Sequence, residues 1–498
     1  MAQKEILNQE ILRYFSISFI IGVFIFLVFT FASSFAMPVL LLFTMLALAY
    51  IVAQFELSAL FILMVIVIPI STNQKILDSD VNMLMPSEPL EAIITLAFGI
   101  KVLFGYKLSG SMVKHPIFWL ILSGIFIQFF ATINSGMPLV SAKTVLLKTC
   151  YIIVFFILSA DLYLKQQINH FKVLKAYFFS LLMVGILIFL KHLEYGLSKD
   201  ISGSVTEPFY ADHTIYSACI AMVLPLPLLT FFNAKTMQFN FYQRFWIACL
   251  SVTMLAFLFY TYCRAAWISF AIACIATFAV FLGLRFKGIL ITIISVLSLM
   301  FMFKTEIADS LKQNKADSNA KNASLEQQTK SVTNITSDQS NAERLNRWSC
   351  AWRMFLDKPL LGYGPGTYQF EYLSYQKKSE MTRISVTSAY NIKKGKGGTA
   401  HSEYLLLLSE SGIISLLLYF TSILMVIYYA LKVYANTDDS KTKVKILILF
   451  FGFCTYILHA FFNNFLDTDK AALLYYTSIA AIMVEAIKLN QLKTKKTT

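Results

Sequence analysis

Apolar stretches long enough to cross a bilayer recur along almost the whole chain of 498 residues, with short polar loops between them. A helix needs about 20 mainly apolar residues to span the hydrocarbon core. The pattern therefore predicts an all-α polytopic membrane protein with about 12–14 transmembrane helices. We place the spans at residues 14–33, 37–53, 57–70, 88–105, 116–134, 146–163, 171–190, 214–232, 245–262, 266–284, 288–304, 411–432, 445–462 and 471–488.

One long polar segment, from Thr305 to Thr399, interrupts this series. It divides the chain into an N-terminal transmembrane bundle of about eleven spans at 1–304, a large extracytoplasmic loop at 305–402, and C-terminal transmembrane helices with a cytoplasmic tail at 403–498. Such a loop, placed between spans, is where we expect the chemistry of a membrane protein of this kind to lie.

The loop itself has parts of different character. The stretch 312–341 is rich in Asn, Ser, Gln, Lys and Asp, which predicts a flexible leader. Trp348, Trp352 and Phe355 then follow at helical spacing and predict an amphipathic helix on the membrane surface. Gly-Tyr-Gly-Pro-Gly at 362–366 predicts a turn, and it lacks the neighbours of a nucleotide-binding loop, so no cofactor is expected.

Basic residues predict which side each loop faces, because Lys and Arg collect in short cytoplasmic loops. They occur in alternate loops and in the C-terminal tail, which predicts that the N- and C-termini are cytoplasmic and that the long loop faces outward. The residues that set this orientation are Lys107, Lys114, Lys165, Lys172, Lys235, Arg244, Arg285, Lys287, Lys441, Lys443, Lys445, Lys493, Lys495 and Lys496.

Composition agrees with the membrane class, since 57% of the residues are hydrophobic and only 14% are charged. Much of the formal net charge of +14 falls in the predicted cytoplasmic loops, so we expect membrane lipids and no nucleic acid as partners. The seven cysteines show neither a disulfide framework nor zinc spacing. For Cys263 and Cys350, predicted outside the spans, we favour packing over a disulfide.

The loop and the span after it carry motifs that resemble the O-antigen ligase and polymerase superfamily, which transfers lipid-linked glycans on the outer face of the bacterial inner membrane. A helix with Arg and Trp is followed by Pro-Leu-Leu-Gly-Tyr-Gly-Pro-Gly-Thr-Tyr at 359–368. His-Ser-Glu-Tyr-Leu at 401–405 and Glu-Ser-Gly-Ile-Ile at 410–414 come next, in the order of the family fingerprint.

Two upstream motifs extend the resemblance to about residues 205–430. Phe-Tyr-Ala-Asp-His-Thr-Ile-Tyr at 209–216 is similar to a family motif that opens a span, and Tyr-Cys-Arg-Ala-Ala-Trp at 262–267 is similar to the family's Ser-Arg-Gly-Ala turn. The chain departs from the family pattern at Ser402, where Asn is common, and at Ala265, where glycine is usual.

The resemblance implies a glycosyltransferase of C-type architecture, acting on the periplasmic face of the inner membrane. It would move a glycan from undecaprenyl diphosphate to an acceptor hydroxyl. The acceptor would be the lipid A core for a ligase, another lipid-linked glycan for a polymerase, or a protein Ser or Thr for an oligosaccharyltransferase. We expect the ligase first and the polymerase second.

The chemistry gives roles to Arg264 and His401. Cleavage of the sugar–diphosphate bond leaves negative charge on the phosphate, which the planar guanidinium of Arg264 would bind. An imidazole pKa near 6.5 suits His401 to take the proton of the acceptor hydroxyl as a general base. The plainer alternatives are a lipid-anchoring arginine and a helix-capping histidine.

Further substrate contacts are expected from Asp212, His213 and Lys199. Asp212 and His213 open a span, where a helix N-terminus favours anions, although an N-cap aspartate beside a surface histidine is the alternative. Lys199 stands near the place where many family members carry an arginine.

The surface helix contributes three arginines to the choice of substrate-binding residues. We favour Arg347 as a contact to the diphosphate or acceptor, with Arg353 and Arg344 behind it. The alternative is that they are the ordinary basic residues on the polar face of a surface helix.

Two other mechanisms stay open. Asp78 and Asp80 have the spacing of a carboxylate pair for a divalent cation, although the Arg and His set predicts a metal-independent transferase. A transporter for the same lipid-linked glycan would need ionisable residues at mid-membrane depth. Lys101, Lys148 and Lys175 are instead predicted near span ends.

Overall fold

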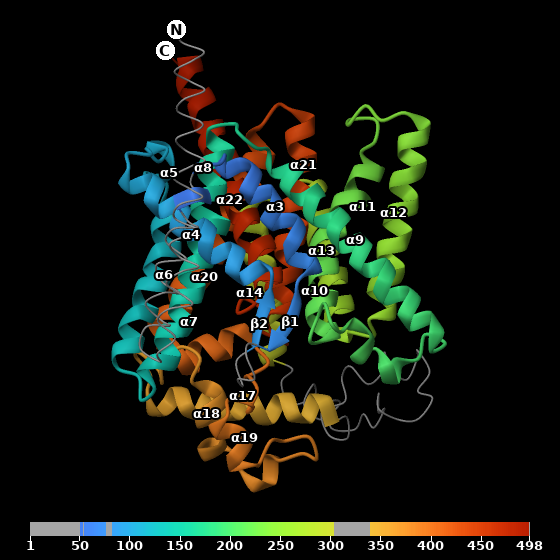
Figure 1. Cartoon of the computed structure of the whole chain (residues 1–498). Coiled ribbons are helices and arrows are strands. Elements are labelled where there is room, and N and C mark those ends of the chain that lie inside the picture. The colour runs from blue at the N-terminus through green and yellow to red at the C-terminus, as the bar shows by residue number, and fades with distance from the viewer. Residues whose placement is uncertain (1–49, 53, 76–81, 303–338, 498) are drawn as a thin grey trace, which may run out of the picture.

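The computed structural model describes residues 50–52, 54–75, 82–302 and 339–497. Within these ranges the chain forms a bundle of long helices with a layer of short helices across one end (Figure 1). The predicted spans 14–33 and 37–53, the acidic pair Asp78 and Asp80, and most of the leader at 312–341 lie outside the described residues.

The bundle confirms an all-α polytopic membrane protein. Nine helices in the described ranges are long and apolar enough to cross a membrane, some of them joined from two labelled elements. Its helical elements are α3 (Leu57–Ile70), α4 (Ser87–Leu103), α5 (Gly110–Val113), α6 (Pro116–Ile133), α7 (Pro138–Tyr151), the π-helical η1 (Ile152–Leu158), α8 (Ser159–Leu164), α9 (His170–Glu194), η2 (Lys199–Ile201), η3 (Ser204–Thr206), α10 (His213–Val223), α11 (Pro225–Phe232), α12 (Phe241–Tyr260), α13 (Arg264–Phe281), α14 (Phe286–Met302), α20 (Glu403–Asn436), α21 (Ser440–His459) and α22 (Asp469–Thr497).

The described chain also contains a short hairpin that the periodicity did not predict. Strand β1 (Thr72–Lys75) pairs antiparallel with β2 (Asn82–Met85), in a register that sets Thr72 opposite Met85. The hairpin joins α3 to α4, and each strand is only four residues long. Strands this short are too brief to show a clear alternation of apolar and polar residues, so the sequence did not reveal the hairpin.

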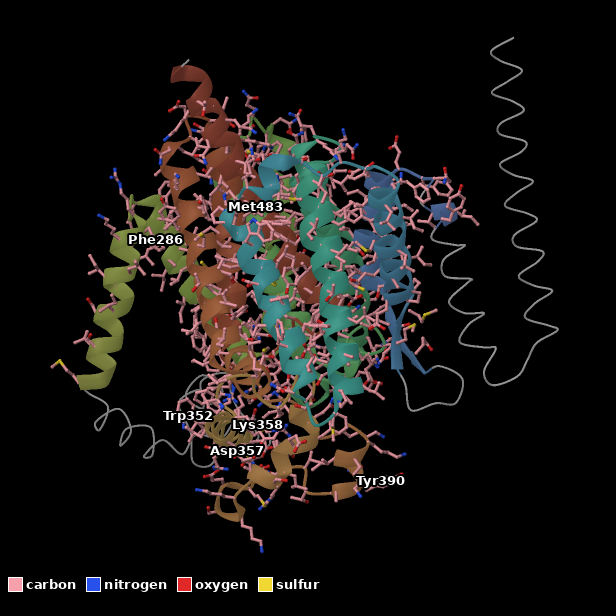
Figure 2. All side chains as sticks on the ribbon, turned by 90° about the vertical axis from the view of Figure 1, so that its left-hand side faces the viewer. Phe286, Trp352, Asp357, Lys358, Tyr390 and Met483 are labelled. Carbon is pink, nitrogen blue, oxygen red and sulfur yellow. The ribbon has the colours of Figure 1, made fainter. Side chains whose placement is uncertain are left out.

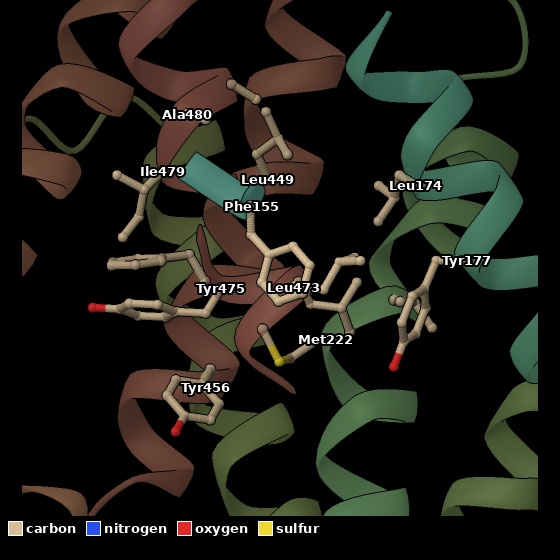
Figure 3. Close-up of a cluster of buried hydrophobic side chains, with 14 of the residues drawn as sticks. Phe155, Leu174, Tyr177, Met222, Leu449, Tyr456, Leu473, Tyr475, Ile479 and Ala480 are labelled. Carbon is tan, nitrogen blue, oxygen red and sulfur yellow. The ribbon is translucent and has the colours of Figure 1, made fainter. Parts of the chain in front are cut away.

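The centre of the bundle is built around α22, which packs against α10, α21 and η1. Figure 3 shows Tyr475 and Leu473 of α22 beside Tyr456 and Met222, all of them buried. The rings of Tyr456 and Tyr475 lie 5.3 Å apart. Gly452 allows α21 to approach α10 closely, because a Cβ there would lie 2.5 Å from the carbonyl oxygen of Met222.

Lys148 departs from its predicted place near a span end. The helix that contains it begins at Pro138, eight residues before the predicted start, so that Lys148 lies about 15 Å along the helix axis. Residues 138–145 include Ser, Lys and Thr, which lowered their apparent hydropathy and assigned them to a loop. Lys148 is largely buried and pairs with Asp467 at 3.1 Å.

The layer across the end of the bundle contains the described part of the long loop. Its main element is α17 (Gln339–Asp357), which crosses the bundle axis at a steep angle in Figure 1. The remaining elements are α18 (Tyr368–Glu371), η5 (Tyr372–Tyr375), η6 (Lys378–Glu380) and α19 (Ala389–Lys393). In the perpendicular view of Figure 2, Trp352, Lys358 and Tyr390 lie in this layer and Met483 lies inside the bundle.

The layer has a small core of its own. Cys350, Ala351 and Met354 of α17 are fully buried against Tyr368 and Tyr372. Cys350 and Cys263 are both free thiols in buried positions, which fits the packing role we favoured. The predicted helix is therefore present, and it is held by this core as well as by the spans.

Candidate functional site

A cavity of about 600 Å³ opens where the bundle meets α17. Segments far apart in sequence form its walls: η2 and the start of α10, the turn before α13, the first turns of α17, the segment just before the cap of α20, and the loop after α21. Its lining residues are Lys199, Asp200, Ser202, Gly203, Asp212, His213, Thr214, Tyr262, Cys263, Arg264, Ala265, Ile268, Ser340, Asn341, Glu343, Arg344, Ile384, His401, Phe462 and Asn463.

Arg264 lies in this wall as the first residue of α13, on the tight turn that the sequence predicts. Tyr262, two residues earlier, has a left-handed backbone with φ of 54°. Its hydroxyl donates a hydrogen bond to the carbonyl of Leu197 at 2.8 Å. The indole N–H of Trp267 donates to the carbonyl of Leu258 at 3.0 Å. These two bonds fix the turn and so place the backbone of Arg264 at the end of the bundle.

His401 also lines the cavity and is held by its backbone. Its φ of 49° is in the left-handed region, which is uncommon for a residue with a side chain. The amide donates to the hydroxyl of Thr399 at 3.2 Å, and the carbonyl accepts the indole N–H of Trp348 at 3.2 Å. A backbone conformation of this kind persists only where the surroundings impose it, so the backbone of His401 is tightly positioned at the cavity.

The next residue explains one departure from the family pattern. The side chain of Ser402 accepts a hydrogen bond from the amide of Leu405 and caps α20. Asn and Ser are both preferred N-cap residues. Ser402 therefore performs the capping that an Asn would perform at this position, and His401 itself stands outside the cap.

Burial and the nearby charges of Arg347 and Arg344 lower the pKa of His401 to about 4. The imidazole is therefore neutral near pH 7 and can accept a proton. Negative charge from Asp212 and Glu343 acts in the opposite direction but is outweighed.

Asp212 and His213 stand together at the start of α10 and line the cavity. The carboxylate of Asp212 accepts hydrogen bonds from the amide and hydroxyl of Thr214 at 2.9 and 2.8 Å, and it lies 3.0 Å from Nδ1 of His213. Burial raises the pKa of Asp212. The hydrogen bond and charge of His213 and the hydrogen bonds from Thr214 lower it by more, so the pKa of Asp212 lies well below its usual value. Asp212 is thus a charged N-cap that orients His213. Lys199, in η2, lines the same cavity.

Arg347 does not line the cavity. Its Nε donates to Glu343 at 2.9 Å, and its Nη1 donates to the carbonyls of Gly397 and Thr399 at 3.0 and 2.9 Å. Its side chain is only 5% exposed. Arg347 therefore ties α17 to the segment that precedes His401.

Arg353 also lies outside the cavity. Of the three arginines on α17, Arg344 is the one that lines it. Arg353 donates hydrogen bonds to the carboxylate of Glu380 and to the carbonyl of Tyr375, within the layer of short helices. Arg344, one turn before Arg347, lines the cavity. The spacing of Glu343 and Arg347, four residues apart on a helix, was the available signal, because such pairs face each other and bond.

The glycine turn docks into a break in α20. Gly412 leaves the helical conformation there, with φ of 74°. The amide of Gly364 donates to the carbonyl of Glu410 at 2.8 Å, and the amide of Ile413 donates to that of Pro359 at 2.9 Å. A Cβ on Gly412 would lie 2.0 Å from the carbonyl oxygen of Leu360. The turn thus supplies the backbone partners that the broken helix lacks.

Side chains extend this junction toward the cavity. The carboxylate of Glu410 accepts the amides of Gly366 and Tyr368, both at 2.9 Å. The hydroxyl of Tyr368 donates to the carbonyl of Arg347 at 2.9 Å. A continuous series of bonds therefore runs from the break in α20, through the turn and Arg347, to the backbone beside His401.

Residues 249–420 match a model of the O-antigen ligase family. This segment of the chain is similar to the O-antigen ligases. The matched segment contains Arg264, Arg344 and His401 together with the docked turn, whereas Lys199 and Asp212 lie before it. A search of curated proteins finds none that matches the chain.

The coarser expectations agree with these findings: the described helices are those of a multi-pass membrane protein, and the matched segment is similar to the O-antigen ligases. Among the described residues, no group of three or more His, Cys, Asp or Glu side chains is arranged to hold a metal ion. The Asp78 and Asp80 pair is outside those residues, so the metal-independent mechanism stays a prediction and a metal site at this pair stays its alternative.

Proposed function

We propose that the protein transfers a glycan from undecaprenyl diphosphate to an acceptor hydroxyl in the cavity where the bundle meets α17. The observation that carries the proposal is that Arg264, Arg344 and His401 line one cavity at the end of the membrane bundle. These are the groups that the leaving diphosphate and the attacking hydroxyl require. The cavity would lie on the periplasmic face of the inner membrane, where the basic loops place it.

The cations would act on the donor. Arg264 stabilises the negative charge that develops on the diphosphate as the sugar leaves, and Arg344 and Lys199 hold the phosphates before and after that step. Because Arg264 stands on a turn that two hydrogen bonds fix, its backbone stays in place during the reaction. This preorganisation is the main source of rate enhancement in the proposal.

His401 would act on the acceptor. Its neutral imidazole accepts the hydroxyl proton as the oxygen attacks the sugar and the bond from sugar to diphosphate breaks, and the imidazolium then releases that proton to water. A pKa near 4 makes the free ring a weak base. Binding of the negatively charged diphosphate in the same cavity raises that pKa, so the base strengthens when the donor is in place. His213, held by Asp212, lies in the same wall and would contact the donor or acceptor.

The ligase acting on the lipid A core is the favoured form of this activity, with the O-antigen polymerase as the alternative and a protein-directed oligosaccharyltransferase after it. A lipid-linked glycan transporter is less well supported. Lys148 does lie within a span, but it pairs with Asp467 and interacts electrostatically with Glu403 and Glu410 beside the break in α20. These buried charges hold the junction of helix and turn together.

A reconstituted assay tests the proposal. Purified protein in lipid is given undecaprenyl-diphosphate-linked glycan and, in separate reactions, lipid A core, a second lipid-linked glycan, or a Ser/Thr-containing acceptor protein. Transfer to lipid A core supports the ligase, and chain lengthening on the lipid supports the polymerase. No transfer to any acceptor, with donor moved intact across the bilayer, would contradict the transferase. Excess chelator should leave activity unchanged.

A further inference from the structure

The loop after α21, residues 460–468, supplies two residues to the cavity wall that the proposed transfer leaves without a role. These are Phe462 and Asn463. Asn463 is only 3% exposed, yet it lines the cavity. A polar side chain at such a place finds its hydrogen-bond partners within the protein or in whatever the cavity holds. The contacts of Asn463 therefore indicate what this part of the wall binds.

One end of the Asn463 carboxamide is held from behind. Its Nδ2 lies 3.0 Å from Nε2 of His459, which stands four residues earlier at the end of α21 and is fully buried. In this arrangement the amide N–H donates to the ring nitrogen. The amide oxygen accepts no hydrogen bond within the described part of the chain, and protein does not enclose it. An available acceptor atom therefore faces the cavity.

The imidazole of His459 is placed for this one contact. The ring of Phe465 packs against it, with 5.4 Å between the ring centroids. Nδ1 of His459 is enclosed and has no hydrogen-bond partner among the described residues. A buried polar atom without a partner lowers stability, and an apolar side chain would avoid that loss. The hydrogen bond to Asn463 is what an apolar side chain could not supply.

The same loop is bonded to both sides of His401. The amide of Glu403 donates to the carbonyl of Ala460 at 2.9 Å. The hydroxyl of Thr399 donates to Oδ1 of Asn464 at 2.5 Å, and it accepts the amide of His401 at 3.2 Å. The loop and the proposed base therefore belong to one part of the cavity wall, where the acceptor must enter.

The chemistry of the exposed atom selects its ligand. A carboxamide oxygen only accepts hydrogen bonds, so it cannot bind the oxygens of a diphosphate, which are acceptors themselves. It suits a hydroxyl. Phe462 adds an aromatic surface beside it, on which the apolar face of a sugar ring can pack. An amide and an aromatic ring together therefore favour a sugar over a phosphate at this place.

We propose that Asn463 contacts the acceptor, by accepting a hydrogen bond from a sugar hydroxyl of the lipid A core next to the hydroxyl that attacks. His459 is a positioning residue, which turns the amide oxygen toward the cavity. This inference rests on the proposed function, because it takes His401 as the base that marks the acceptor side. A site built to bond a hydroxyl discriminates against acceptors that lack it, so Asn463 contributes to acceptor specificity.

The test compares Asn463→Ala with a matched control, Asn233→Ala. Nδ2 of Asn233 donates to the carbonyl of Leu229 at 2.9 Å, so this amide is also bonded four residues back at a helix end, but outside the cavity. Two measurements use purified full-length protein. The first gives the KM for lipid A core and the KM for the undecaprenyl-diphosphate-linked glycan. The second gives binding of lipid A core without donor, through the concentration dependence of the Tm.

We expect Asn463→Ala to weaken binding of lipid A core and to raise its KM, each by about tenfold, while the KM for the donor and the control variant stay unchanged. If Asn463→Ala does not fold, Asn463→Ser replaces it, with a smaller loss in the same direction. A rise confined to the donor KM would support the sugar contact and assign it to the donor. Unchanged binding and KM values in the folded variant would overturn the contact.

Failure of this inference can be told apart from failure of the proposed function. A wild-type protein that transfers glycan to another acceptor but does not bind lipid A core would overturn the contact and leave the transferase standing. Binding of lipid A core that depends on Asn463, without any transfer, would support the contact and contradict the transferase.

A double-variant cycle tests the positioning role. His459→Leu should give the same selective rise in the KM for lipid A core, and His459→Gln should restore most of the affinity, because its amide can bond Asn463 in place of Nε2. Adding Asn463→Ala to His459→Leu should cause no further rise, since one interaction underlies both losses. Additive losses, or equal rises in both KM values in His459→Leu, would show that His459 acts only on the fold.

Discussion

Two regions carry the sequence motifs of the segment that matches the O-antigen ligase model, and different interactions form them. The turn at 359–368 meets the break at Gly412 through backbone groups, and glycine is required there because no Cβ fits. The wall of the cavity is formed instead by charged and ionisable side chains, Arg264, Arg344 and His401. A family fingerprint therefore mixes residues that shape the protein with residues that do chemistry.

Substitutions should separate the two regions by their readouts. Changes in the docked turn should lower the stability of the protein, with activity falling only as folded protein is lost. Changes in the cavity wall should lower the rate of transfer in a protein that stays folded.

The largest effect is expected at the helix break. Gly412→Ala forces a Cβ against the carbonyl of Leu360 at 2.0 Å and strains a backbone with φ of 74°. We predict a loss of about 4 kcal/mol in the free energy of unfolding, measured by denaturation in detergent. Gly283→Ala is the matched control, because Gly283 has a φ of 100° but no atom near its Cβ position. Equal losses at both glycines would show that the docked turn contributes no specific packing.

The next effect concerns the cavity wall. Arg264→Ala should lower the rate of transfer by about 10² to 10³ while the Tm stays near that of the wild type, because a charge that stabilises the transition state is lost. Arg264→Lys should recover only part of the activity, since Lys keeps the charge but not the planar fork. Arg383→Ala serves as the control, because Arg383 is an exposed arginine in the layer of short helices. Full activity in folded Arg264→Ala would remove this residue from the mechanism.

A smaller effect distinguishes two arginines on one helix. Arg344→Gln, in the cavity wall, should raise the KM for the lipid-linked donor by about tenfold through loss of one phosphate contact. Arg347→Gln should instead lower the Tm, because it leaves the buried carboxylate of Glu343 without its ion pair. Kinetics and thermal unfolding of both variants provide the measurement. The reverse pattern would restore Arg347 to the site.

The sequence predicted the membrane-spanning helices of the described region and several walls of the cavity. Long apolar runs report on spans directly, and Arg264 and His401 adjoin spans whose positions those runs determine. The fold also places Lys199, Asp212 and His213, which the sequence proposed as substrate contacts, in the cavity wall. Periodicity could not place Lys148, because Pro138 starts its helix within a weakly apolar stretch.

The sequence indicated only in part which arginine of α17 faces the cavity, through the four-residue spacing of Glu343 and Arg347. Arg344 and Arg347 are separated by one turn, and the difference between them depends on Glu343, Gly397 and Thr399, which meet only in the fold. The break in α20 was equally hidden, because Gly412 in an apolar run reads as a tolerated helix residue. The carbonyl of Leu360, which leaves no room for a Cβ at Gly412, lies far away in sequence.

The pH dependence gives the smallest and most specific effect. His401 acts as a base only when neutral, so activity should be present above its pKa and fall as the pH drops through it. For kcat/KM, which reports the free enzyme, that fall should occur near pH 4. The fall in kcat should occur at higher pH, because bound diphosphate raises the pKa. A return to pH 7 before assay checks that the protein survives. A fall in kcat/KM at pH 6.5 or above would contradict the burial of this ring.

The most direct test of the central claim is the rate of glycan transfer by purified His401→Asn under single-turnover conditions. Asn tolerates the left-handed backbone at this position, so the variant should keep the fold and its Tm. We predict a rate lower by about 10² to 10⁴, because the base is lost while Arg264 and the donor contacts remain. A folded His401→Asn protein that transfers glycan at the wild-type rate would contradict the account.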